Sequence, residues 1–416
     1  MGARIVFLLG CFLGMLHAEE AVAELRGEIE RLTQRLDQIE KEKIQEKQAS
    51  QQKGFLELSS DKTVLGVGGR IDLQSIWGWP EGALFADSRI PLKSAHDNAQ
   101  MKMSARDSRL WVKSRTPTEY GPLRTLVEID FWGSDGNEKN VNAHNPRLRH
   151  AYLQIGGLTV GQTNSAFNAF VTVDTISYII NDTLVRQPLI RLSLENDTFG
   201  VDLSFEQPET TLVDKNGVML TPQDDVVPDI VARVRYYPAW GEAALALIGR
   251  YIAQDHTSLS DATQTTKKDS AFGYGVNLSA KIKTFDRDDI RLDAQYGKGM
   301  GRYLAYDAYA AGFIDDTGNI TLQESFGWHV GYRHYWAKTW RSTLAWAYAG
   351  TKNDERIFVA DREKVNKSAS SIQANLFWDA VPNGLVGVEY AKGVRKVFSG
   401  AKGDIDLALL IFRYDF

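Results

Sequence analysis

The clearest pattern in the chain is the alternation of apolar and polar residues near its C-terminus. Residues 405–416 read Ile-Asp-Leu-Ala-Leu-Leu-Ile-Phe-Arg-Tyr-Asp-Phe, so every second residue from Ala408 to Phe416 is apolar, while Arg413 and Asp415 lie on the other face. A strand of about ten residues with one apolar face and an aromatic last residue is typical of a membrane-spanning barrel. Taken alone, this segment is also compatible with the last strand of a soluble β-sandwich.

The same alternation recurs along the chain and predicts an all-β fold, a transmembrane antiparallel β-barrel of about 16 strands. Seven short connections alternate with long polar ones, which a soluble sandwich does not require but a membrane barrel does. An even number of strands puts both ends of the barrel on the periplasmic side. The predicted strands are Leu65–Trp77, Ser108–Thr116, Leu123–Phe131, Arg147–Ile155, Leu158–Thr163, Leu189–Leu194, Phe199–Glu206, Ile230–Tyr237, Glu242–Ala253, Ala271–Phe285, Ile290–Tyr296, Phe326–Trp336, Thr339–Tyr348, Ser370–Trp378, Leu385–Tyr390 and Asp404–Phe416. The predicted long connections are 78–107, 132–146, 164–188, 207–228, 254–269, 297–324, 349–368 and 391–402.

The N-terminus has the pattern of a secretory signal peptide. Arg4 precedes an apolar run from Ile5 to Leu16 and small residues follow, which predicts a signal peptide over 1–18 with an alternative cut after residue 23. No later segment offers about eighteen consecutive apolar residues, so we expect no membrane-spanning helix. The only cysteine is Cys11, which leaves the mature chain without thiols for disulfides or metal ligands; a lipoprotein cleavage site ending at Cys11 is an alternative reading.

A short coiled coil is predicted between the signal peptide and the barrel, over residues 19–44. Its apolar positions repeat at alternating intervals of three and four residues, as in the a and d seam of a coiled coil. An amphipathic helix lying alone on the protein surface is the alternative. Residues 45–53 are polar and predict a linker, and the barrel domain is expected over 54–416. The seam residues are Val22, Leu25, Ile29, Leu32, Leu36 and Ile39.

Composition and charge fit a barrel and argue against an enzyme. Aromatic residues make up 11% of the chain and the mean hydropathy is −0.30, because a barrel hides its apolar content in alternation. The net charge of −5 gives no reason to expect a nucleic-acid partner. No histidine pair has zinc-protease spacing and no serine lies in a nucleophile elbow, so we expect no catalytic residues, no metal and no cofactor.

Several motifs resemble the DcaP-like family of outer-membrane porins. They are Ser108–Lys113, Val127–Gly133, Pro146–Tyr152 and Leu158–Thr163, in this order and spacing. The resemblance is densest over 108–170 and loose beyond it, and a leading coiled coil is also a feature of that family. The resemblance implies a trimeric sixteen-stranded porin for passive uptake of small anions, often dicarboxylic or aromatic.

Basic residues alternate with apolar ones on the predicted strands and should face the lumen. An arginine facing lipid at mid-membrane costs about 2–4 kcal/mol. Convergent guanidinium groups would concentrate anions and bind carboxylates in a fork. Glu128, Asp130, Asp202, Asp229 and Asp293 share the inward parity, so the alternative is that they neutralise the arginines. The predicted anion-contacting residues are Arg109, Lys113, Arg147, Arg149, Arg191, Arg233, Arg235, Arg250 and Arg333.

The connection 164–188 is predicted to be a constriction loop. It is too apolar for a loop in water, so we expect it to lie against the inner wall and narrow the pore; packing outside on neighbouring loops is the alternative. Its candidate residues are Phe170, Asp174, Tyr178, Asp182 and Arg186.

The expected partners are outer-membrane lipid, small solutes, two further copies of the chain and the barrel-assembly machinery, which would contact the strand ending at Phe416. Parity puts Leu148, His150 and Tyr152 on one face, which we expect at the trimer interface. The predicted function is therefore an outer-membrane porin that favours anions. The alternative is a structural protein that tethers the membrane to the periplasm or cell wall through its coiled coil.

Overall fold

The structure is a computed structural model that describes residues 63–79, 90–92, 99–134, 141–168, 170, 172–178, 180, 184–352 and 359–416. All of these belong to one compact unit, Glu57–Phe416. The predicted signal peptide, coiled coil and linker lie outside the described residues, and so does the predicted boundary at residue 54. No helix in the described residues is long and apolar enough to cross a membrane.

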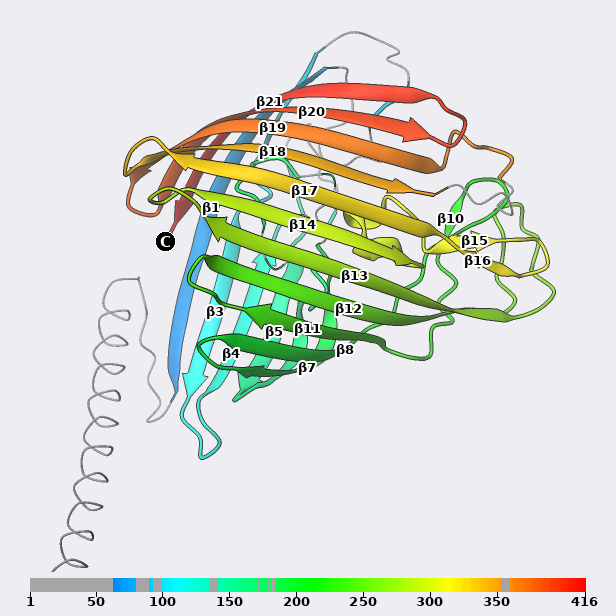
Figure 1. Ribbon diagram of the computed structural model, residues 1–416, viewed down its shortest axis with the longest axis horizontal. Helices are drawn as coiled ribbons and strands as arrows, with labels where there is room; N and C mark the ends of the chain where they lie inside the picture. The colour runs from blue at the N-terminus through cyan, green and yellow to red at the C-terminus, as the bar shows by residue number, and fades with distance from the viewer. Residues whose placement is uncertain are drawn as a thin grey trace, which may run out of the picture. The chain divides into compact units, whose positions relative to one another are not determined.

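The described strands form a closed antiparallel ring with sixteen positions, which confirms the predicted barrel (Figure 1). Each strand pairs with the strands before and after it, and β1 also pairs with β21, which closes the ring. In chain order the strands are β1 (Val64–Trp79), β3 (Arg109–Thr116), β4 (Leu123–Asp130), β5 (Arg147–Ile155), β6 (Leu158–Asn164), β7 (Arg186–Glu195), β8 (Phe199–Glu206), β11 (Asp229–Tyr236), β12 (Gly241–Gln254), β13 (Asp269–Lys283), β14 (Asp289–Lys298), β17 (Glu324–Tyr335), β18 (Trp340–Thr351), β19 (Asn366–Val381), β20 (Gly384–Val397) and β21 (Lys402–Asp415).

Strand β2 (Gln100–Ser104) shares one ring position with β3. Both pair with β1: β2 opposite Gln74–Gly78 and β3 opposite Val64–Arg70. At the closure, Gly69 and Phe416 exchange two backbone hydrogen bonds of 3.0 Å. A Cβ on Gly69 would lie 2.4 Å from Cζ of Phe416, so the aromatic ring lies over the glycine and requires it.

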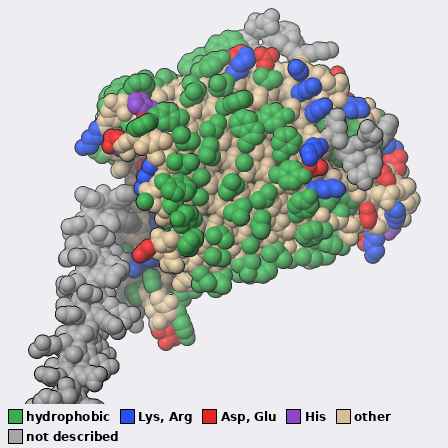
Figure 2. All heavy atoms as spheres, in the orientation of Figure 1, with side chains coloured by type: hydrophobic (Ala, Val, Ile, Leu, Met, Phe, Trp, Pro, Cys, Tyr) green, Lys and Arg blue, Asp and Glu red, His purple; other side chains and the backbone are tan. Residues whose placement is uncertain are grey.

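The two faces of each strand differ, as the alternation predicted. On β8, Val201, Leu203 and Phe205 are exposed on the outside, while Asp202 and Glu206 are buried on the inside. Figure 2 shows hydrophobic side chains over the outer surface, with charged side chains gathered towards its ends. An apolar outer face of this kind suits lipid, and each strand of the described ring is paired on both sides, as a barrel in lipid requires.

The short connections gather at one end of the barrel, here called the turn end, and the long connections at the other, the loop end (Figure 1). Trp340 and Trp378 stack beside the turns, with ring centroids 5.5 Å apart, as expected for an aromatic belt at a membrane surface. One prediction is wrong here: the long connection 391–402 is mostly strand. Alternation continues past Tyr390, so β20 and β21 leave only residues 398–401 between them.

A second, four-stranded sheet joins two long connections at the loop end. Its strands are β9 (Leu212–Val213), β10 (Met219–Leu220), β15 (Gly312–Ile314) and β16 (Ile320–Leu322), with β9 and β15 parallel. Asp315 closes the β15–β16 turn by accepting hydrogen bonds from Thr317 and Asn319. Burial opposes ionisation of Asp315, but these hydrogen bonds outweigh it and lower the pKa of the carboxyl to about 2.

Candidate functional site

The inward face of β3 to β5 carries a cluster of arginines around two carboxylates. Arg147 makes two hydrogen bonds to Asp130, of 2.9 and 2.6 Å. Arg149 bridges Glu128 at 2.6 Å and Asp130 at 2.8 Å. Arg109 lies further off, with Nη1 3.7 Å from Oε1 of Glu128. Three predicted lumen residues are thus brought together, and all three are paired.

A β-bulge at Arg149 corrects the expected trimer contact. The pairing of β4 with β5 shifts register between Glu128 and Ile129, so Arg149 is the extra residue. Leu148 points outward, but His150 pairs opposite Glu128 on the inner side and hydrogen-bonds Thr163 at 3.0 Å. Strict parity across the segment was therefore wrong, and neither His150 nor Tyr152 lies on the outward face with Leu148.

A second arginine cluster lies on β11. Arg233 and Arg235 share Asp202 of β8, at 2.8 and 3.1 Å. The ring of Phe170, from the connection 164–188, lies 5.5 Å from the Arg233 guanidinium. Arg191 on β7 donates to the carbonyl oxygen of Asn164 at 3.4 Å. These groups bring predicted lining residues and a predicted constriction residue together.

The third arginine cluster lies across the barrel, on β14, β17 and β18. Arg291 and Arg333 share Asp289, at 2.7 and 2.5 Å. Asp174, from the connection 164–188, pairs with Arg341 at 2.7 Å and lies 3.6 Å from Arg333. The Asp174 carboxylate therefore fixes the connection to the wall.

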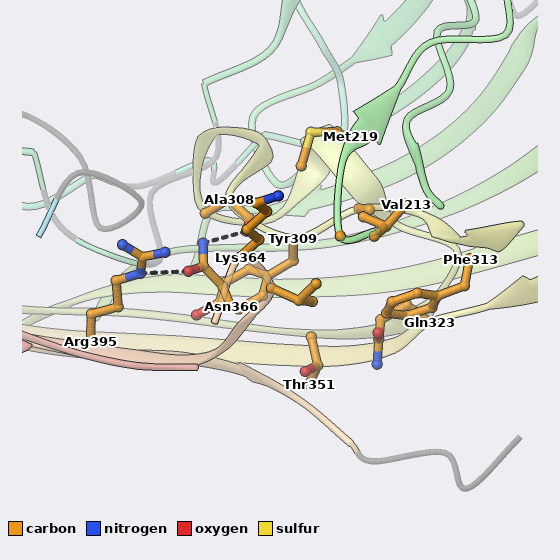
Figure 3. Close-up of a pocket in the computed structure, with 13 residues that line it drawn as sticks. Val213, Met219, Ala308, Tyr309, Phe313, Gln323, Thr351, Lys364, Asn366 and Arg395 are labelled. Carbon is orange, nitrogen blue, oxygen red and sulfur yellow. Dashed lines mark hydrogen bonds between the residues drawn. The ribbon is translucent and has the colours of Figure 1, made fainter. Parts of the chain in front are cut away.

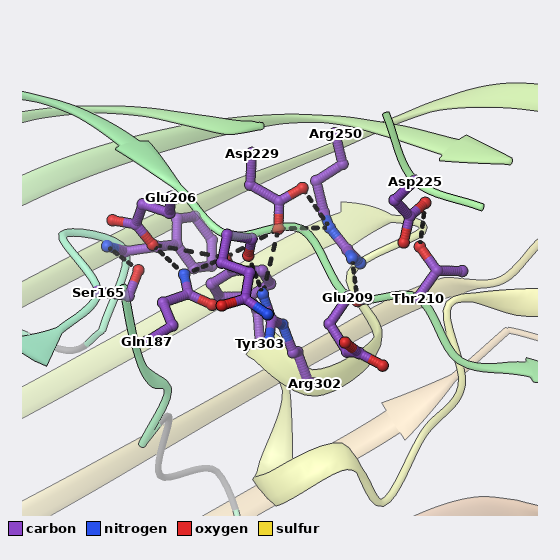
Figure 4. A network of polar contacts seen from close by, with 12 residues as sticks. Ser165, Gln187, Glu206, Glu209, Thr210, Asp225, Asp229, Arg250, Arg302 and Tyr303 are labelled. Carbon is purple, nitrogen blue, oxygen red and sulfur yellow. Dashed lines mark hydrogen bonds and ion pairs between the residues drawn. The ribbon is translucent and has the colours of Figure 1, made fainter. Parts of the chain in front are cut away.

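Arg250 was predicted to contact anions, but its side chain is 1% exposed and no solute can reach it. It pairs with Asp229 at 3.2 Å and donates to the carbonyl oxygens of Gly299 and Met300 at 2.8 and 3.0 Å (Figure 4). The alternation along the strand correctly placed Arg250 on the inner face. It gave no sign of the chain segment that covers this side chain. Lys113 on β3 is exposed, with Nζ 5.5 Å from the Trp111 ring.

The described residues of the connection 164–188 lie along the inner wall. Phe170 N donates to Ser279 of β13 at 3.1 Å, and Arg291 of β14 donates to the carbonyl oxygen of Thr172 at 2.6 Å. Further along, the backbone amides of Ile176 and Ser177 donate to Glu389 of β20 at 2.6 and 2.8 Å. The described residues between 165 and 180 are together named segment A.

Of the predicted constriction residues, Asp182 lies outside the described residues. Arg186 is the first residue of β7 rather than part of a loop, and it interacts electrostatically with Arg147, Arg149 and Tyr178. Its Nη1 is buried without a hydrogen-bond partner in the described structure. Arg186 thus extends the cluster of β3 to β5.

A second segment enters the barrel, and sequence reasoning missed it. The connection 297–324 was expected to be a polar outer loop, but residues 299–311, here segment B, are almost wholly buried. They include the short 3-10 helices η2 (Gly301–Tyr303) and η3 (Ala305–Asp307). Two signals could have found it: the apolar Met300, Tyr303 and Leu304 in a supposedly polar loop, and small inward residues on the facing strands. A Cβ on Gly297 would lie 2.6 Å from Sδ of Met300.

The same signal marks the wall beneath segment A, where a Cβ on Gly331 would lie 2.6 Å from Cγ1 of Val173. Inward positions of β18 are filled by Ala345, Ala347 and Ala349, all buried in the apolar cluster that includes both segments. Small side chains on the wall therefore provide the volume that the segments occupy.

A polar network holds segment B to the wall (Figure 4). Gln187 donates to the Tyr303 hydroxyl at 2.8 Å, and that hydroxyl donates to Asp229 at 3.0 Å. Glu206 accepts from Gln187 and from the backbone amide of Ala166 in segment A. Burial, with the adjacent Asp229 and Glu206, raises the pKa of Tyr303 well above its ordinary value, so its hydroxyl stays a donor.

The inner wall shows one repeated arrangement: each of six carboxylates is shared by two arginines. Ten arginines therefore surround six carboxylates, so positive charge is in excess around them. The shared sets are Asp130 with Arg147 and Arg149, Glu128 with Arg109 and Arg149, Asp202 with Arg233 and Arg235, Asp229 with Arg250 and Arg302, Asp289 with Arg291 and Arg333, and Asp174 with Arg333 and Arg341.

A cavity of about 260 Å³ lies beside segment B, between the small sheet and the wall (Figure 3). Lys364 and Arg395 line it together with Tyr309 and Phe313. Asn366 joins the two sides, accepting from Arg395 at 2.6 Å and donating to the carbonyl oxygen of Ala308 at 2.8 Å. Two basic side chains, Lys364 and Arg395, therefore line this cavity. In the described residues no group of acidic and histidine side chains has the arrangement of a metal site.

Comparison with known proteins agrees with this geometry. The family model described as the porin subfamily matches residues 65–391. Porin Omp2b of Brucella melitensis biotype 1 is 26% identical over 179 residues, 40% of this chain and 42% of the relative, so the chain matches less than half of that relative's length. Among solved structures, the outer membrane channel DcaP of Acinetobacter baumannii superposes with a TM-score of 0.72 at 22% identity, over 86% of this chain and 99% of that one. An anion-selective porin from Comamonas acidovorans gives a TM-score of 0.56 at 13% identity, over 85% and 100%.

Proposed function

The chain belongs to the porin subfamily, as the resemblance read from residues 108–170 indicated, and we propose that it is an outer-membrane channel for passive diffusion of small hydrophilic solutes, favouring anions. Family and fold indicate a channel rather than an enzyme. In this proposal the turn end faces the periplasm and the loop end faces outward, as in other outer-membrane barrels.

The observation that carries the anion preference is that six inward carboxylates are each shared by two arginines. Four further acidic groups, Asp72, Asp293, Glu206 and Glu389, are 0%, 2%, 1% and 3% exposed, so they contribute little at the accessible surface. The Arg147 side chain is 41% exposed. A weakly hydrated, planar guanidinium at such a position suits a carboxylate in transit.

We propose that the lumen is lined by the basic residues that remain accessible, and that segment A narrows it. Phe170 and Tyr178 contribute apolar surface there, while Asp174 serves to hold the segment. The wall contacts of segments A and B run from β7 round to β20, so the cluster on β3 and β5 faces the remaining passage. The proposed lining residues are Arg109, Lys113, Arg147, Arg149, Arg186, Arg191, Arg233, Arg235 and Arg333.

Three copies of the chain are proposed to assemble in the membrane, as the DcaP-like resemblance implies. The outward apolar surface would contact lipid and the neighbouring copies, and the barrel-assembly machinery would act on β21. Native mass spectrometry in a mild detergent tests the assembly: a mass of three chains supports it, and a single-chain mass contradicts it.

The test of function is the reversal potential of the purified protein in a planar bilayer under a potassium chloride gradient. We expect a potential on the anion-selective side, with conductance appearing in steps of three. A cation-selective potential would show that the carboxylates dominate the accessible surface, and the absence of channels would contradict the proposal as a whole.

A further inference from the structure

Segments A and B meet inside the barrel through two aromatic pairs. Phe167 and Tyr303 pack edge to face with ring centroids 5.6 Å apart, and both are fully buried. Tyr178 and Tyr306 pack with centroids 5.0 Å apart at 67°. Unlike the first pair, this one remains accessible: Tyr178 is 37% exposed and Tyr306 is half-buried. The second pair is therefore the part of the junction that a solute can touch.

The backbone of segment B is bent to present Tyr306. Ala305 and Tyr306 have φ of 48° and 55°, a left-handed conformation that is unfavourable for residues other than glycine. Such a conformation persists only where its surroundings impose it. Fixed points lie on both sides: Tyr303 in the buried network, and Tyr309, whose hydroxyl donates to the carbonyl oxygen of Ala349 at 3.0 Å.

Tyr178 lies on the side of this pair that faces the arginine cluster. Its hydroxyl is close enough to Asp107, Arg147 and Arg186 to interact with them electrostatically. Burial, followed by Asp107, raises the pKa of Tyr178 to about 12, so the phenol is neutral at any physiological pH. The neutral ring of Tyr178 thus lies within electrostatic range of Asp107 and of the arginines Arg147, Arg149 and Arg186.

We propose that Tyr178 and Tyr306 together are specificity-determining residues, forming the aromatic side of the narrowest part of the channel. The inference rests on the proposed channel function and adds segment B to the constriction. The two rings limit the cross-section of a solute and provide a surface on which a flat apolar body can lie while its carboxylate meets the arginines opposite. Neither segment forms this surface alone, because the pair joins one ring from each.

The variants Tyr178→Ala and Tyr306→Asn test the pair. Asparagine tolerates the left-handed conformation better than most residues, so Tyr306→Asn removes the ring with the least disturbance to segment B. We expect either change to raise single-channel conductance in potassium chloride by roughly 1.2- to 2-fold. The double variant should conduct only slightly more than the better-conducting single variant, because both rings narrow the same opening.

Selectivity is measured with benzoate and cyclohexanecarboxylate, two monoanions of similar size of which only the first is flat. We expect either substitution to lower the benzoate to cyclohexanecarboxylate permeability ratio by roughly 2- to 10-fold, the range of an aromatic contact. Tyr120→Ala is the matched control, because Tyr120 is 76% exposed in the connection between β3 and β4 at the turn end of the barrel. Unchanged conductance and ratio in both test variants would overturn the inference.

The outcomes separate the two proposals. A wild-type protein that forms no channel contradicts the proposed function, whereas a wild-type channel that is indifferent to both rings contradicts only this inference. If Tyr306→Asn does not fold, Tyr306→Cys in a Cys11→Ser background replaces it, since Cys11 is the only other cysteine. Treatment with a charged methanethiosulfonate reagent should then reduce the current, and an unaffected current would count against the pair.

Discussion

Replacing Arg109 with alanine tests the electrostatic reasoning with little disturbance to the fold. The Arg109 side chain is 25% exposed, and its ion pair with Glu128 is long, at 3.7 Å. Glu128 keeps Arg149 as a partner at 2.6 Å, and Asp107, which also interacts with Arg109, keeps its hydrogen bond from Gln74 at 3.1 Å. We therefore expect the variant to form the barrel with one positive charge fewer at the passage.

The size of the effect follows from Coulomb's law. A unit charge on the order of 8 Å from a passing ion changes the ion's energy by about 0.5 kcal/mol at the dielectric constant of water. Salt at about 0.1 M, with a Debye length of about 10 Å, screens this to roughly 0.2 kcal/mol. An anion loses that stabilisation and a cation loses an equal repulsion, so the anion to cation permeability ratio should fall about twofold.

The assay is the reversal potential across a roughly tenfold potassium chloride gradient, where a twofold change in the ratio moves the potential by about ten millivolts. Lys268→Ala is the control, since it removes one positive charge from a side chain that is 77% exposed in the connection 255–268. The difference should shrink at about 1 M salt, where the Debye length is about 3 Å. Equal potentials for Arg109→Ala and the wild type at low salt, or an equal shift in the control, would refute the reasoning.

Three further predictions concern the wall, the core and the loop end. Gly331→Val puts a side chain where Val173 lies, so we expect segment A to move and conductance to rise; Val173→Ala in the same chain should reverse the rise, and unchanged conductance would contradict the packing. His329 is 2% exposed and neither ring nitrogen has a hydrogen-bond partner in the described structure, so His329→Leu should raise the free energy of unfolding by about 1–3 kcal/mol. A higher conversion temperature of the folded band in electrophoresis would show this, and a lower one would mean the ring has a partner. The folded pKa of Asp315, about 2, lies below the ordinary 3.8, so its contribution to the β15–β16 hairpin is full above about pH 4 and is lost as the pH falls through 2. Pepsin should therefore cut Asp315→Ala in this hairpin at about pH 4 but the wild type only near pH 2, and identical profiles would disprove the stabilisation.

The strands were predictable because lipid and water impose opposite demands on neighbouring residues. The alternation from Ala408 to Phe416 leaves β21 only one way to face, and the same holds on β8 and β11. Assigning faces by strict alternation failed where the backbone contains a β-bulge. The extra residue at Arg149 reverses the faces of His150 and Tyr152, and nothing in the side-chain pattern marks a bulge of one residue.

The contents of the lumen were less predictable than its wall. Arg250 was assigned correctly to the inner face, yet its role depends on which segment covers it, and that is a contact across 49 residues of chain. Segment A was found because its apolar residues form a dense run. Segment B places only a few, such as Met300 and Tyr303, among glycine and alanine, so its burial becomes evident only when the small residues on the facing strands are considered with it.

The pairing of β1 with β21 determines how the folded barrel can unfold. It joins residues as far apart as Arg70 and Asp415, 345 positions along the chain. Unravelling usually starts at a free edge strand, and among the described strands only the short β2 has an edge without a strand partner, while every strand of the ring itself is paired on both sides. Opening must therefore break a whole strand pairing at once, which makes the lifetime of the folded state a matter of an unfolding rate rather than of equilibrium stability. A barrel of this kind would resist proteases and denaturants for longer than its free energy of unfolding alone predicts.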